Sequence, residues 1–156
     1  MTVQIQEGDK APGFSLPRDG GEIVSLADYA GKKLVIYFYP KDSTPGCTTE
    51  AIEFTNAKAA FEAAGTEIVG VSRDSLKRHE NFITKQDLKI ALLSDEDGKM
   101  TDDYGVWVEK KNYGRTYMGI ERSTFLVDES GKVEQIWRKV RVKGHVDAVL
   151  AAVIGD

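Results

Sequence analysis

The run Leu34-Val-Ile-Tyr-Phe-Tyr39 constrains the fold of this chain more than any other segment. It is apolar on both faces of an extended strand, as a central strand covered by helices on each side would be. It is also far too short to cross a membrane. Pro40 ends the run, and the turn-forming segment 41–46 follows it. The sequence therefore predicts a central strand that leads through a turn into a helix.

The pattern after this turn is that of one helix running to Gly65. Its apolar side chains recur at steps of three and four residues, at Ala51, Phe54, Ala57, Phe61 and Ala64. Glycine is a common terminator of helices, so Gly65 marks the predicted end.

The rest of the chain alternates strand and helix patterns. We expect strands at 22–26, 66–72, 90–93, 122–127 and 132–137, and an exposed strand edge at 138–143. We expect a helix capped by Ser75, a short helix ending near Gly105, and a last helix that carries Val146, Val149, Leu150 and Val153. The loop 128–131 has the length and the glycine of a hairpin connection.

This order of elements predicts an α/β protein with a central mixed sheet flanked by helices. The early strands are expected to be parallel and the late hairpin antiparallel, and the strand at 22–26 forms an N-terminal β extension. A length of 156 residues fits one domain spanning 1–156.

The charge balance argues against several classes of partner. The chain has 21 Lys and Arg against 25 Asp and Glu, for a net charge of −4, so neither nucleic acid nor an anionic membrane surface is an expected partner. The N-terminus lacks the basic and apolar regions of a signal peptide. We therefore expect a cytoplasmic protein in a reducing compartment.

Cys47 is the single cysteine of the chain. One thiol excludes an internal disulfide, a paired-cysteine redox motif and any multi-cysteine zinc or iron–sulfur site. Any redox chemistry at Cys47 must therefore be completed by a group from outside the chain.

The residues before Cys47 predict that it lies in the first turn of its helix. Thr44 fits the N-cap, Pro45 the first helical position and Cys47 the third. An N-cap hydroxyl usually meets the backbone N–H of that third residue, which would put the Thr44 side chain beside Cys47. A helix N-terminus favours the thiolate form of a cysteine. A cysteine on the apolar stripe of a helix is about as often a small buried hydrophobe, and the pattern alone leaves both interpretations open.

Ionisation of the thiol gives only a limited gain in rate. A fast reaction of a thiolate needs a second group that stabilises charge on the departing atom.

Other motifs carry weaker signals. His79 and His145 fit packed or capping histidines, and 95–98 fits a turn rather than a calcium loop. Asp19-Gly20-Gly21 fits a turn rather than a phosphate loop. We expect no metal and no cofactor.

The segment Pro40-Lys-Asp-Ser-Thr-Pro-Gly-Cys47-Thr-Thr-Glu50 resembles the peroxiredoxin active-site motif Pro-x-x-x-Thr-x-x-Cys. Its form is similar to that of the peroxiredoxin Q or bacterioferritin-comigratory subfamily. Segments 8–14, 104–115 and 119–128 resemble the opening and later signatures of that family. The resemblance implies a thioredoxin-like fold and a thiol-dependent peroxidase that reduces hydrogen peroxide and organic hydroperoxides.

The resemblance also implies roles for individual residues. Cys47 would be the peroxidatic thiolate that becomes a sulfenic acid. Thr44 would hydrogen-bond the thiolate and the peroxide, and Pro40 would wall the pocket. Arg122 would hold a cation near the sulfur and the leaving oxygen, which is the second group required above.

Two supporting residues lie beside Cys47. Gly46 belongs to the motif, and Glu50 would orient an arginine, although a solvated carboxylate in the first turns of the helix is nearly as common.

The chain departs from the subfamily pattern at Ile52. Many members carry a resolving cysteine five residues after the first, where this chain has isoleucine. The resemblance therefore implies a one-cysteine cycle with an external thiol as partner: thioredoxin, glutaredoxin or a small thiol. We expect a monomer or a weak homodimer.

Two other functions are open at this point. Cys47 could serve a peroxide sensor or a chaperone-like binding protein without turnover, or it could pair with a histidine in a hydrolase.

Overall fold

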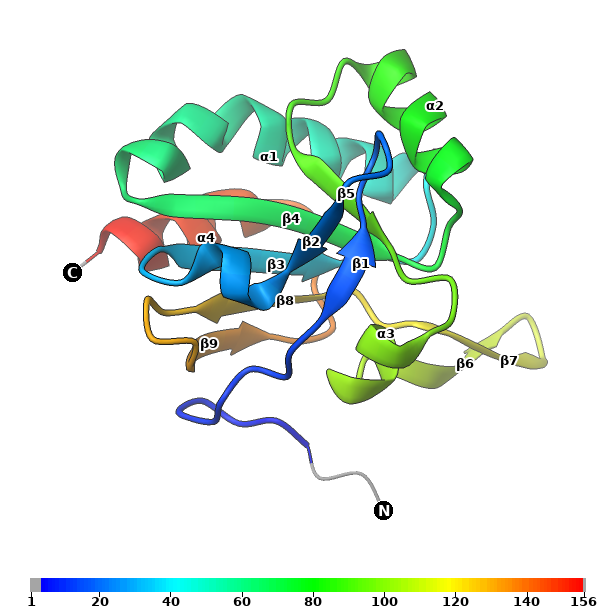
Figure 1. Cartoon of the computed structure of the whole chain (residues 1–156). Helices are drawn as coiled ribbons and strands as arrows, with labels where there is room; N and C mark the ends of the chain where they lie inside the picture. The colour runs from blue at the N-terminus through cyan, green and yellow to red at the C-terminus, as the bar shows by residue number, and fades with distance from the viewer. Residues whose placement is uncertain (1–3, 156) are drawn as a thin grey trace.

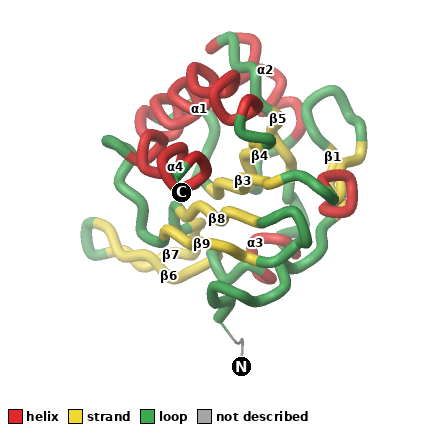
Figure 2. The backbone as a smooth tube through the Cα atoms, turned by 90° about the vertical axis from the view of Figure 1, so that its left-hand side faces the viewer, coloured by secondary structure: helices red, strands yellow, loops and turns green. Residues whose placement is uncertain are grey.

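The computed structural model describes residues 4–155, and a five-stranded sheet in the order β5-β4-β3-β8-β9 forms its centre (Figure 2). Its parallel strands are β3 (Lys33–Phe38), β4 (Thr66–Ser72) and β5 (Ala91–Ser94), and its antiparallel strands are β8 (Ser123–Val127) and β9 (Val133–Trp137). The predicted central strand is β3, between β4 and β8. The mixed sheet and its late antiparallel hairpin are confirmed.

The two faces of β3 point into two separate apolar cores. Val35 and Tyr37 pack against α1 (Pro45–Ala63), α2 (Leu76–Gln86) and α4 (His145–Ile154), which cover one face of the sheet (Figure 1). Ile36 and Phe38 face the opposite core, which is shared with α3 (Lys99–Asp103). No helix within residues 4–155 combines the length and apolar character that a membrane crossing requires.

The N-terminal β extension is also confirmed. It is a small antiparallel sheet of β1 (Ser15–Pro17) and β2 (Ile23–Ser25), followed by the 3-10 helix η1 (Leu26–Tyr29). Strand β1 was not predicted, because three residues with a proline at the end carry too little pattern.

Several predicted ends of elements are confirmed. Ser75 caps α2, since its Oγ accepts a hydrogen bond of 3.2 Å from the Arg78 N–H. Gly131, in the loop between β8 and β9, has φ +88°, a conformation that favours glycine. The turn at 95–98 holds α3, because the Asp95 carboxylate accepts from the N–H groups of Met100 and Thr101.

A hairpin that the sequence analysis missed projects beyond α3 (Figure 1). It consists of β6 (Trp107–Asn112) and β7 (Arg115–Ile120). Its two-residue loop has φ +52° at Tyr113 and +74° at Gly114, as in a type I′ turn. Most of its residues are exposed, so the sequence lacks the alternation of apolar and polar residues by which strands are recognised.

The prediction of a strand edge at 138–143 is wrong. Strand β9 ends at Trp137, and Lys139 has φ +50°, which is incompatible with an extended strand. The segment is a loop that passes the start of β8, where the Val140 N–H donates a hydrogen bond of 2.9 Å to the Arg122 carbonyl.

Candidate active site

Strand register brings two distant parts of the chain together at the carboxyl end of the central strand β3. Phe38 at the end of β3 lies opposite Ser123 at the start of antiparallel β8. Helix α1 begins shortly after β3, and Arg122 directly precedes β8. Cys47 and Arg122, which are 75 positions apart in the sequence, therefore become neighbours.

The Arg122 guanidinium bridges Cys47 and Glu50. Its Nη2 lies 3.4 Å from Cys47 Sγ, and its Nη1 donates a hydrogen bond of 2.6 Å to Glu50 Oε1. Cys47 is the third residue of α1, as predicted, and its side chain is buried, with 1% exposed. Burial alone would fit a structural cysteine, but the guanidinium places a fixed positive charge directly beside the sulfur.

Burial governs the electrostatics of Glu50 and Arg122. Desolvation raises the pKa of Glu50 from 4.5 to about 7, against the opposing effect of Arg122. Burial also disfavours the charged form of Arg122, but the neighbouring Glu50 and Cys47 more than offset this, and the pKa of Arg122 is raised. The guanidinium is therefore the permanent charge of the group. Glu50 Oε2 is buried without a hydrogen-bond partner among residues 4–155.

Gly46 permits the close approach of Arg122. A Cβ atom at this position would lie 3.2 Å from Arg122 Nη2 and 3.9 Å from a methyl group of Val142. The guanidinium is tied to Glu50 and has little freedom to move away. A side chain at position 46 would therefore displace the guanidinium from the sulfur.

Thr44 lies at the N-cap of α1, but its side chain does not cap the helix as predicted. Its Oγ1 donates a hydrogen bond of 2.8 Å to the Lys41 carbonyl and makes no bond to the helix. The predicted bond, in which this oxygen would accept from the Cys47 N–H, is wrong, because the side chain is turned toward the Lys41 carbonyl in the preceding loop. The lone pairs of the Thr44 oxygen remain available as acceptors.

Pro40 lies at the wall of a cavity of about 340 Å³ next to the β6–β7 hairpin. The cavity is lined by Pro40, Lys41, Arg73, Asp74, Trp107, Lys110, Tyr117, Met118, Gly119 and Ile120. Lys110 is electrostatically coupled to the thiol site, since burial and the nearby Arg122 lower its pKa. Lys110 was not predicted, because the exposed hairpin that carries it lacks a strand pattern in the sequence.

Neither histidine hydrogen-bonds Cys47 within the described part of the chain. His145 Nε2 lies 2.7 Å from Thr124 Oγ1, and burial together with Arg122 lowers its pKa to about 4. His79 is fully buried and bonds Asp42 and the Leu93 carbonyl. A Cys–His nucleophile pair is therefore not formed.

A buried thiol beside a permanent guanidinium charge matches what a thiol-dependent peroxidase requires, because the same charge can serve the sulfur and the leaving oxygen. The sequence model of the AhpC/TSA family matches residues 7–136, so the chain belongs to this family.

Relatives of similar length carry peroxiredoxin names. The putative peroxiredoxin bcp of Coxiella burnetii is 49% identical over 148 residues, which cover 95% of this chain and 98% of the relative. The peroxiredoxin Bcp of Bacillus subtilis is 50% identical over 150 residues, covering 96% and 94%. The assignment to the peroxiredoxin Q and bacterioferritin-comigratory group is confirmed, and so is the function as a thiol-dependent peroxidase.

Solved structures show the same fold. Peroxiredoxin Q of Xanthomonas campestris superposes with a TM-score of 0.87 at 52% identity, covering 90% of this chain and 89% of that one. A mutant of PrxQ from Xylella fastidiosa gives 0.93 at 38% identity, covering 97% of both. A further Xanthomonas structure (TM-score 0.86, 51% identity, 90% of each chain) concerns the alkyl peroxide reduction activity of its bacterioferritin comigratory protein. The thioredoxin-like fold is confirmed.

The raised pKa of Glu50 predicts a pH dependence of stability. Because the folded protein binds this proton more tightly than the unfolded chain, the resulting stability is present below pH 4.5 and is lost as the pH rises through about 7. The Glu50→Gln variant has no titrating group at this position. As the pH rises from 4.5 to about 7, the unfolding free energy of the wild type should therefore fall relative to that of Glu50→Gln, by an amount on the order of 3 kcal/mol.

Urea unfolding at a series of pH values measures this difference. Glu62→Gln, which removes an exposed carboxylate from the same helix, controls for the loss of a charge. Curves of wild type and Glu50→Gln that stay parallel from pH 4.5 to 8 would contradict the assignment.

Proposed function

We propose that Cys47 reduces hydrogen peroxide and organic hydroperoxides with Arg122 as its electrostatic partner. One observation carries the proposal: a single guanidinium lies 3.4 Å from Cys47 Sγ and is held by a bond of 2.6 Å to Glu50. A thiolate needs the positive charge before the reaction, and the departing oxygen needs it during the reaction.

The first step is a displacement at oxygen. The Cys47 thiolate attacks one peroxide oxygen, so an S–O bond forms and the O–O bond breaks. The sulfur is oxidised to sulfenic acid, and the peroxide is reduced to an alcohol or water once the leaving oxygen takes a proton. The guanidinium stabilises the negative charge that develops on that oxygen.

The second step uses a thiol from another molecule. The chain has no second cysteine, and Ile52 is a half-buried residue packed against the core that α1 shares with α2 and α4. An external thiolate attacks the sulfenic acid, forming an S–S bond and releasing water. A second thiol then reduces this mixed disulfide and restores Cys47. Thioredoxin, glutaredoxin and a small thiol all satisfy this chemistry.

The remaining site residues position this pair. Glu50 orients Arg122, and Gly46 leaves room for the guanidinium. Pro40 shields the sulfur from water at the wall of the adjacent cavity. Thr44 accepts a hydrogen bond from the hydroperoxide O–H, because its own proton is donated to the Lys41 carbonyl.

Three broader expectations remain predictions. They are a single domain over 1–156, a monomer or weak homodimer, and a cytoplasmic location, where reduced thiols are abundant.

Turnover separates a peroxidase from a sensor. With excess dithiothreitol, the wild-type protein should consume many equivalents of hydrogen peroxide or alkyl hydroperoxide, and Cys47→Ser should consume none. A single stoichiometric burst without turnover would instead support a sensor or chaperone-like protein. Mass spectrometry after one equivalent of peroxide distinguishes sulfenic acid, a mixed disulfide and a Cys47–Cys47 dimer.

The role of Thr44 predicts a split between two substitutions. Thr44→Val should slow peroxide reduction by about tenfold or more, because the oxygen that accepts from the hydroperoxide is lost. Thr44→Ser keeps the hydroxyl and should retain most of the rate. Stopped-flow measurement of Cys47 oxidation gives both rate constants, and equal rates for the two variants would refute the role.

A further inference from the structure

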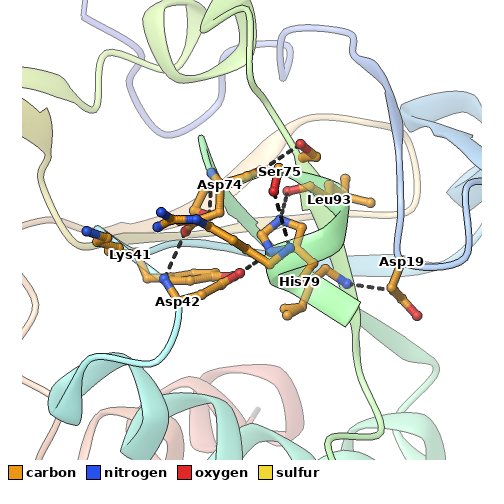
Figure 3. A network of polar contacts seen from close by, with 12 residues as sticks. Asp19, Lys41, Asp42, Asp74, Ser75, His79 and Leu93 are labelled. Atoms are coloured by element: carbon orange, nitrogen blue, oxygen red, sulfur yellow. Dashed lines mark hydrogen bonds and ion pairs between the residues drawn. The ribbon is translucent and has the colours of Figure 1, made fainter. Parts of the chain in front are cut away.

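A buried polar network holds the loop that presents Cys47. Asp42 lies in this loop, between β3 and α1, and its side chain is almost fully buried. The Tyr39 hydroxyl donates a hydrogen bond of 2.5 Å to Asp42 Oδ1, and His79 Nδ1 lies 2.6 Å from Asp42 Oδ2 (Figure 3). The contact between Asp42 and His79 joins the Cys47 loop to α2, which lies on a different part of the chain.

The partners of His79 fix its protons. Its Nε2 lies 2.8 Å from the Leu93 carbonyl, which can only accept, so Nε2 carries a hydrogen. Nδ1 faces a carboxylate oxygen, so a second proton lies between His79 and Asp42. Burial lowers the pKa of His79, but the hydrogen bond to Asp42 more than offsets this, and the pKa is raised above 6.5.

A second carboxylate fixes the backbone of the same loop. The Asp42 N–H donates a hydrogen bond of 2.8 Å to Asp74 Oδ2, which also accepts from Ser72 Oγ at 2.7 Å. Arg78 on α2 lies 3.6 Å from Asp74 Oδ1. The groups that face His79 and its partner are thus Tyr39, Asp42 and Asp74, and Arg78 is engaged with Asp74.

This cluster is not a vacant metal site. Donor atoms of Asp42, Asp74 and His79 lie within 4.8 Å of one another. Both ring nitrogens of His79 and both oxygens of Asp42 are already in hydrogen bonds. The arrangement is complete as a set of protein contacts, with the loop as the part that it immobilises.

The chemistry of the proposed function places two opposite demands on this loop. Cys47 is 1% exposed, which suits a small peroxide, but an external thiol must reach the same sulfur to attack the sulfenic acid. The loop must therefore be closed during oxidation and open during reduction. Whatever sets the free energy of opening also sets the balance between the two steps.

We propose that His79 is a positioning residue, and that the buried Asp42–His79 pair is the latch that keeps the Cys47 loop closed. This inference rests on the proposed peroxidase function. The pair holds the segment that includes Thr44 and the start of α1 while peroxide reacts, and it must break before the external thiol attacks. His79 does not touch the reacting atoms and acts through Asp42.

The latch is sensitive to pH. Because the pKa of His79 is raised in the closed state, the stability that the pair contributes is complete below pH 6.5 and is lost as the pH rises through the raised pKa. Tyr39 does not titrate in this range, since burial and Asp42 raise its pKa well above 10. The loop should therefore open more readily in alkaline solution.

Two rate constants test the proposal. Stopped flow measures oxidation of Cys47 by peroxide, and 5-thio-2-nitrobenzoate then measures attack of an external thiolate on the sulfenic acid. In Asp42→Ala and His79→Leu, oxidation should slow by about tenfold and thiolate attack should accelerate by a similar factor, as loss of a charged hydrogen bond implies. Asp95→Ala is the control, because it removes a fully buried carboxylate that holds α3 and not the Cys47 loop. It should not slow oxidation while accelerating thiolate attack.

Asp42→Asn is the conservative variant. Asparagine can accept from Tyr39 and donate to a neutral His79, so the latch keeps its hydrogen bonds without its charges. Its rates at pH 7 should lie much closer to wild type than those of Asp42→Ala. As the pH rises from 6 to 9, thiolate attack in the wild type should accelerate relative to Asp42→Asn.

The outcomes separate this inference from the proposed function. Opposed changes in the two rate constants, with rescue by Asp42→Asn, support the latch. Parallel changes in both rate constants, or changes no larger than those of Asp95→Ala, overturn it while the wild type still turns over peroxide. A wild type without turnover would instead overturn the proposed function.

Discussion

The ion pair between Arg122 and Glu50 is the interaction on which the site depends. Its bond of 2.6 Å lies in the interior, where Glu50 is fully buried. An isolated carboxylate or thiolate in such surroundings is strongly disfavoured. The guanidinium neutralises both, and its second nitrogen lies 3.4 Å from the sulfur. One fixed charge therefore supports a buried acid and a reactive thiol at the same time.

The fold fixes the position of the Arg122 guanidinium through several separate segments. The register of β3 and β8 brings Arg122 to the first turn of α1, and Gly46 leaves space for its side chain. Val140, in the loop after β9, bonds the Arg122 carbonyl and fixes its backbone. Three separate segments thus determine the position of one guanidinium. Under the proposed function, the single thiol would gain its reactivity from this placement as well as from its own helix.

Local sequence patterns predicted the parts of the fold that depend on burial and on turns. The apolar run of β3, the start of α1 and the glycine of the β8–β9 hairpin all appear in the structure where the pattern indicates. The β6–β7 hairpin was missed because exposed strands have no apolar periodicity. The prediction of a strand edge at 138–143 was wrong, because an alternation of basic and apolar residues also occurs in this loop, where Lys139 has a positive φ.

The site residues also fall into those that local sequence predicts and those that it does not. Cys47 could be placed in the first turn of a helix from its neighbours, but Arg122 is one of 21 basic residues and only a family resemblance singled it out. The contacts of Lys110 and His79 depend on tertiary geometry. Asp42 and His79 are 37 positions apart, and no local pattern connects them.

The variant Arg122→Ala separates the two effects of the guanidinium when two reactions of Cys47 are compared. Peroxide reduction requires the guanidinium at the leaving oxygen, whereas alkylation by iodoacetamide requires only a thiolate. We expect the peroxide rate constant to fall by about 10²-fold or more, as for loss of one electrostatic donor, and the alkylation rate constant to fall much less. Equal losses in both reactions would contradict this expectation, because Arg122 would then act only on ionisation of the thiol.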